Sequence, residues 1–115
     1  MKYIVKKSEV TPVNEDNSQF YEYDFSNRTI SVGVSEINGR YPKSGFEVDE
    51  EIEAYWYVAS GAGTIWICGS EHLVEEGDMI AVPKGEKYWV NGDHLRLVVC
   101  GTPVWNESQH KHFEK

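Results

Sequence analysis

The sequence is poor in cysteine and has no long apolar run. Only two cysteines occur among the 115 residues, Cys68 and Cys100, and both lie within apolar segments typical of strands. A secreted domain of this size would usually carry more cysteine, so we expect two buried free thiols in a reducing compartment. No apolar run approaches the roughly 18 residues of a membrane span, and no signal-peptide pattern precedes Lys6. These absences predict a soluble, cytoplasmic protein.

Basic residues are also scarce relative to acidic ones. The chain has 11 lysines and arginines against 19 aspartates and glutamates, which gives a net charge of −8. Nucleic acids and anionic membranes are bound through basic surfaces, so we expect neither as a partner. The negative charge is interpreted as a solubility feature. A hydrophobic content of 40% indicates a folded protein, and the length predicts a single domain over residues 1–115.

Strand patterns fill the chain, and no helical periodicity of any length is present. About ten short alternating or apolar segments are separated by glycine, proline, asparagine and aspartate turn signals, at intervals typical of all-β folds. The sequence therefore predicts an all-β sandwich or barrel. The candidate strands are 3–5, 20–25, 29–37, 46–48, 54–59, 64–67, 72–74, 79–82, 88–90 and 95–100.

The longest of these patterns is AYWYVASGAGTIWI at 54–67. The SGAG segment at 60–63 predicts a β-hairpin with a two-residue loop. One face of that hairpin would be buried, and it would carry Ala54, Trp56, Val58, Ile65 and Ile67. The opposite face would place Tyr55, Tyr57 and Trp66 together. Since such an aromatic patch is rarely left exposed, we expect a homodimer through these three residues.

The stretch GDMIAVPKGEKY at 77–88 resembles the second motif of the cupins, G-x5-P-x-G-x2-H. The predicted hairpin likewise resembles the end of their first motif, and the resemblance extends from Gly39 to Trp105. It implies a cupin-like double-stranded β-helix, which is a jelly-roll barrel. Residues 106–115 then form a polar C-terminal tail, in which His110 and His112 are interpreted as exposed.

The resemblance also locates four positions at which cupins typically bind a divalent metal through an H-x-H pair, a glutamate and a second-motif histidine. Counting back from Gly61, the first three positions read Glu47, Asp49 and Ala54, and the second-motif histidine position, three residues after Gly85, is Tyr88. A shorter gap would choose Val48 and Glu50 for the first pair instead. None of the four is the usual ligand, so we expect a degenerate metal site without metal or other cofactor. Carboxylates could still hold Mg²⁺, Ca²⁺ or Mn²⁺, which leaves a divergent metal site open.

The same positions predict a pocket for a small molecule. Alanine in place of glutamate leaves room in the barrel, and strand alternation directs Tyr88 inward, where its hydroxyl needs a partner. The candidate ligand-binding residues are Glu47, Asp49, Ala54, Trp56 and Tyr88.

Three functions stay open from the sequence. The first is a metal-free cupin that binds a small polar metabolite such as a sugar in the barrel lumen. The second is an enzyme, either an isomerase or epimerase or a divergent metal-dependent cupin, that uses Glu47, Asp49 and Tyr88. The third is a structural dimer in which Trp56 and Tyr88 simply fill the core.

Overall fold

The computed structural model describes residues 2–26 and 29–115, and these residues form strands and short turns without an α-helix. The predicted all-β class is confirmed. The elements are η1 (Lys7–Glu9), β1 (Val13–Glu15), β2 (Ser18–Tyr23), β3 (Ser31–Tyr41), β4 (Phe46–Asp49), β5 (Glu53–Ile67), β6 (Ser70–Glu75), β7 (Met79–Val82), β8 (Tyr88–Thr102), η2 (Glu107–Gln109) and β9 (His110–Phe113).

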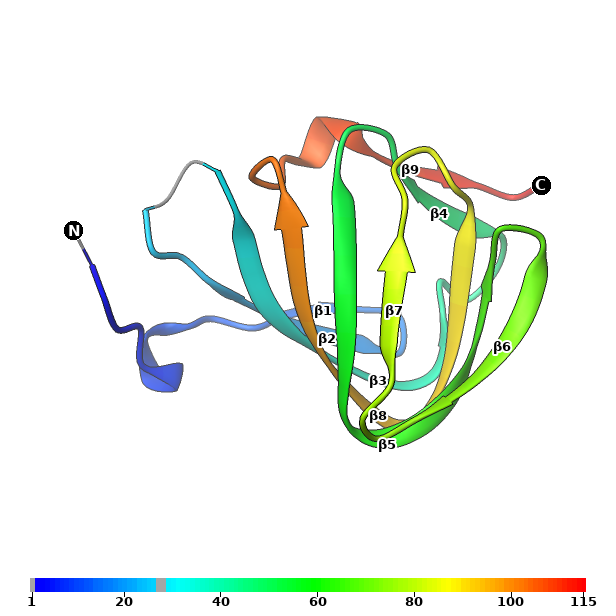
Figure 1. The fold of residues 1–115 in the computed structure, drawn as a ribbon, viewed down its shortest axis with the longest axis horizontal. Helices are drawn as coiled ribbons and strands as arrows, with labels where there is room; N and C mark the ends of the chain where they lie inside the picture. Colours follow the sequence, from blue (N-terminus) through cyan, green and yellow to red (C-terminus); the bar gives the residue numbers. More distant parts are fainter. Residues whose placement is uncertain (1, 27–28) are drawn as a thin grey trace.

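Two strands of 15 residues each, β5 and β8, organise the barrel. They pair with each other along their length, in antiparallel register from Glu53 opposite Thr102 to Ile67 opposite Tyr88. On one side β5 also pairs with β6 and β7, and on the other side β8 pairs with β3 and β4. In Figure 1 the β5–β8 pair bends sharply and returns, so the sheet curls around a central space.

The bend lies where the sequence predicted a hairpin turn, and that prediction was wrong. The ladder with β8 shifts register twice, between Val58 and Ser60 and again between Ser60 and Ala62, so the chain bulges but does not reverse. Gly61 has φ +76°, and a Cβ there would meet the carbonyl oxygen of His94. Glycine is therefore required at a bulge as it would be at a turn. This shared requirement explains the error.

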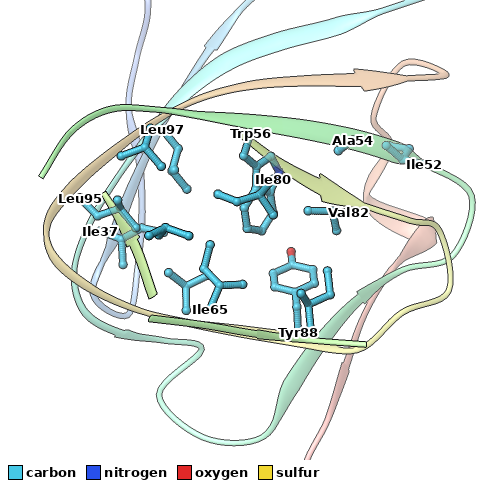
Figure 2. Close-up of a cluster of buried hydrophobic side chains, with 14 residues drawn as sticks. Ile37, Ile52, Ala54, Trp56, Ile65, Ile80, Val82, Tyr88, Leu95 and Leu97 are labelled. Atoms are coloured by element: carbon cyan, nitrogen blue, oxygen red, sulfur yellow. The ribbon is translucent and has the colours of Figure 1, made fainter. Parts of the chain in front are cut away.

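The buried face of this segment was nevertheless predicted correctly. Ala54, Trp56 and Val58 are buried before the bend, while Ile65 and Ile67 are buried after it. The bulges shift the two-residue alternation by one position, which keeps both halves of β5 facing the core. Figure 2 shows these side chains in the barrel with residues from β3, β7 and β8, among them Ile37, Ile80, Val82, Leu95 and Leu97.

Three further local predictions were wrong. Residues 3–5 form no strand, because no neighbouring strand pairs with them. Both cysteines are exposed rather than buried: Cys68 has a positive φ at a turn, and Cys100 points outward beside Tyr55. Asn38-Gly39, a hairpin-type turn signal that follows the candidate strand 29–37, marks a bulge inside β3 instead of a turn.

A search of the described residues finds no helix long and apolar enough to cross a membrane.

Candidate ligand-binding site

The site depends on the C-terminal segment, which the sequence indicated to be a polar tail. Instead, β9 adds to the edge of β4, with His110 opposite Asp49 and His112 opposite Glu47. Figure 1 shows the two strands side by side. The interpretation of both histidines as exposed tail residues was wrong for His110, whose side chain is only 21% exposed. Because the paired segments are about sixty residues apart, the H-x-H spacing of His110 and His112 is the one local feature of the sequence that could have indicated this site.

Asp49 is buried and is held by two residues of the returning chain. Its Oδ1 lies 2.7 Å from Nδ1 of His110 and accepts a hydrogen bond of 3.0 Å from Nε2 of Gln109. Gln109, which is 1% exposed, also accepts a 3.2 Å bond at Oε1 from the backbone N–H of Glu51. Both ends of this amide, Nε2 and Oε1, thus bond to β4 or the turn that follows it, which fixes the Asp49 carboxylate.

Glu47 lies beside the same histidines and is 2% exposed. Its Oε2 atom is 3.6 Å from Nε2 of His110 and 3.4 Å from Nδ1 of His112. Both distances exceed those of a good charged hydrogen bond, and this buried oxygen has no hydrogen-bond partner among the described residues. Burial lowers the pKa of His110, but its interactions with Asp49 and Glu47 outweigh this and raise the pKa to about 10. His110 is therefore an imidazolium cation at neutral pH.

Tyr88 begins β8 inside the barrel, as strand alternation predicts, and is 4% exposed. Its ring makes an edge-to-face contact with Trp56, with centroids 5.1 Å apart. Figure 2 shows the hydroxyl directed into the interior. The structure gives this hydroxyl no hydrogen bond to any described residue, so the expected bond to Glu47 or Asp49 is absent. Burial, together with the negative charge of Asp49, raises the pKa of Tyr88 well above 10, and the phenol stays protonated.

These groups face a cavity of about 410 Å³ inside the barrel. Four of the five predicted ligand-binding residues line it, namely Asp49, Ala54, Trp56 and Tyr88, whereas the buried Glu47 is not part of the lining. Tyr41 and His110 are among the polar residues of the lining that sequence reasoning missed. Burial raises the pKa of Tyr41 as well, with a further contribution from Glu47, so the cavity contains a second protonated phenol.

The residues present do not fit the divalent metal that the fold resemblance implies. Ala54 offers no donor atom, and the raised pKa of Tyr88 opposes ligation by a phenolate. His110 faces carboxylates with both ring nitrogens and, as a cation, has no lone pair for a metal. Among the described residues, no three histidine, cysteine, aspartate or glutamate side chains are arranged to hold an ion.

No family model matches the chain, and no curated protein matches it in sequence. Solved structures do match in shape. The chain superposes on the Streptomyces nucleoside dehydratase Pac13 with a TM-score of 0.90 and 18% identity, over 99% of this chain and 92% of that one. It also superposes on the Schizosaccharomyces pombe Cnp3 cupin domain with a TM-score of 0.63 and 15% identity, over 80% and 69% of the two chains. The chain has the cupin fold.

A third cupin-like match is the ectoine synthase of P. lautus, with a TM-score of 0.74 and 17% identity over 96% and 90% of the two chains. Three Pac13 variants, two with a tyrosine replaced by phenylalanine and one with a histidine replaced by glutamine, have been solved with uridine. The three superpositions confirm that this chain forms the jelly-roll barrel of the cupins, as predicted. At these identities the likeness concerns the fold alone.

Proposed function

We propose that this cupin-fold protein binds a small hydroxylated metabolite, of the size of a nucleoside or a sugar, in the lumen of its barrel. The observation that carries the proposal is the hydroxyl of Tyr88, a buried residue of the cavity lining, which is directed into the interior without a hydrogen bond to a described residue (Figure 2). A phenol hydroxyl can both donate and accept a hydrogen bond. It is therefore available to a polar ligand in the lumen.

The chemistry of the cavity supports this class of ligand. Its volume of about 410 Å³ lies within the range of small-molecule sites, roughly 300–1,000 Å³. Trp56 and the aliphatic wall offer apolar surface for a ring, while Tyr41, Tyr88 and Asp49 offer donors and acceptors for hydroxyl groups. A cavity of this size also argues against a merely structural barrel with a filled core.

The fold neighbours support the same proposal. Pac13 is a nucleoside dehydratase, and its variants were solved with uridine. Ectoine synthase is a further cupin-like enzyme of small molecules. Uridine is accordingly the first ligand to test.

The test is a calorimetric titration of the untagged protein with uridine, together with mass spectrometry of small molecules released on denaturation. Binding at one site per chain, weakened at least tenfold by Tyr88→Phe without a change in melting temperature, supports the proposal. Uridine binding that is unaffected by Tyr88→Phe, or the absence of any bound or released hydroxylated compound, contradicts it.

A second candidate function is proton-transfer catalysis in the same cavity, as in an isomerase, epimerase or dehydratase. The contact of 2.7 Å between His110 and Asp49, next to two protonated phenols, favours it. In such a reaction the Asp49 carboxylate would accept a proton from the substrate, and Tyr88 or His110 would donate one to an oxygen. Incubating the bound ligand in D₂O and following its carbon-bound protons by NMR distinguishes turnover from binding alone.

A further inference from the structure

Negatively charged side chains line the opening of the cavity. Glu15 on β1, Glu22 on β2 and Glu107 in η2 line it and are exposed, so they lie where the cavity meets solvent. Farther in, Asp49 adds a fourth carboxylate. None of the described lining residues is a lysine or arginine. Two of these elements, β1 and β2, are consecutive paired strands, whereas η2 lies near the C-terminus, and each of the three contributes an acid.

The single cationic group in the lining, His110, is already neutralised. Asp49 lies 2.7 Å from one of its ring nitrogens and Glu47 lies 3.6 Å from the other. Two carboxylates therefore face one imidazolium, which leaves no positive charge for a ligand. The same negative charges act on the two phenols. Burial is the largest cause of the raised pKa values of Tyr41 and Tyr88, and the charges of Glu47, Asp49 and Glu15 raise them further.

We propose that this arrangement selects ligands by charge: the lumen accepts uncharged or cationic compounds and rejects phosphate esters and carboxylates. A phosphate that entered would lose its hydration, meet four carboxylates in the lining and find no lysine or arginine among the described residues. An amine at the same place would be attracted by Glu15, Glu22 and Glu107. This inference rests on the proposed function and narrows its ligand class from hydroxylated metabolites of any charge to uncharged or cationic ones, such as nucleosides, sugars and their amino-substituted analogues, as distinct from nucleotides and sugar phosphates.

The experiment compares uridine, uridine 5′-monophosphate and 5′-amino-5′-deoxyuridine by calorimetry at low salt. We expect the monophosphate to bind at least tenfold more weakly than uridine, and the amine to bind at least as tightly as uridine. The triple variant Glu15→Gln, Glu22→Gln, Glu107→Gln removes the acidic opening, and it should reduce the penalty on the monophosphate at least threefold.

A matched control separates a local effect from the overall charge of the protein. The triple variant Glu71→Gln, Glu75→Gln, Glu76→Gln on and beside β6 changes the net charge equally at exposed positions outside the cavity, and should leave the penalty unchanged. A monophosphate that binds as tightly as uridine overturns the charge selection but not the proposed function. An equal effect of the two triple variants also overturns it. If none of the three compounds binds and no hydroxylated compound is released on denaturation, both proposals fail together.

Discussion

His110 and Asp49 lie 61 residues apart in the sequence, and their side chains meet at 2.7 Å in the wall of the barrel. The contact joins the last strand, β9, to its neighbour β4, so the C-terminal segment completes the candidate site. It also places a protonated imidazole and a carboxylate beside the cavity that Tyr88 enters. Most of the predictions below follow from this arrangement.

Tyr88→Phe is expected to weaken ligand binding at least tenfold, about 1.4 kcal/mol, because the phenol hydroxyl is directed into the lumen (Figure 2) and can hydrogen-bond to a ligand. Folding stability should stay within about 0.5 kcal/mol, since the ring and its contact with Trp56 are kept. Calorimetry and urea unfolding measure the two effects. Tyr57→Phe, outside the barrel, is the control. If Tyr88 only filled the core, binding would be unchanged.

His110→Gln is expected to make the free energy of unfolding less dependent on pH between pH 6 and 10. The pKa of His110 is raised from 6.5 to about 10 in the folded protein, so its contribution is fully present below pH 6.5 and is lost as pH rises to 10. We expect the wild type to exceed the variant by about 2 kcal/mol near pH 6, after allowance for partial exposure, and by little near pH 10. Urea unfolding between pH 6 and 10 measures this. A difference that is constant with pH would contradict the ion pair.

Gln109→Leu is expected to destabilise the protein by about 1–3 kcal/mol, because it removes the bonds to Asp49 and to the Glu51 amide at a fully buried position. It should also weaken ligand binding, since Asp49 loses the group that orients it. Ser108→Ala, an exposed neighbour, serves as the control. Equal unfolding midpoints for the two variants would show that Gln109 does not hold Asp49.

We propose a homodimer through the outer face of β5, β7 and β8, in a revised form. Tyr57 pairs laterally with Met79 and Val98, and these side chains are 41%, 64% and 43% exposed. Tyr55, which is 48% exposed, continues the patch. Trp66 does not belong to it, because it lies beyond the bend and packs against Phe46 with ring centroids 4.9 Å apart.

The patch predicts a mass of twice 13.2 kDa in sedimentation at micromolar concentration. Tyr57→Lys should give the monomer mass with an unchanged melting profile of the barrel. Leu73→Lys alters an apolar side chain that is 86% exposed on β6, outside the patch, and should not affect the mass. A wild-type mass of 13.2 kDa would refute the dimer.

The protein is expected to retain no stoichiometric iron, manganese or zinc after dialysis against a chelator. The reason is the donor set, in which Ala54 has no ligand atom and His110 is paired with two carboxylates. Elemental analysis of untagged protein tests this. One equivalent of metal that survives dialysis, and that is lost in a Glu47→Gln variant but not in Glu71→Gln, would contradict it.

Local sequence patterns were sufficient for the class of fold and for several inward-facing side chains. Alternation over residues 54–58 and 88–90 placed Ala54, Trp56 and Tyr88 inside the barrel, because the direction of a side chain in a strand depends only on its immediate neighbours. The glycines of 60–63 were ambiguous, since a turn and a bulge both need residues without a Cβ.

Only the tertiary structure decided which distant segments meet. The sequence placed Asp49 beside a possible ligand, but nothing near it indicated that Gln109 and His110 would bond to its carboxylate. The tail has a polar sequence because β9 lies at the edge of the sheet. It pairs with β4 on one side, and three of its four residues are exposed to solvent. Strand pairing at this separation is determined by the closure of the whole barrel, so the complete site exists only in the folded chain.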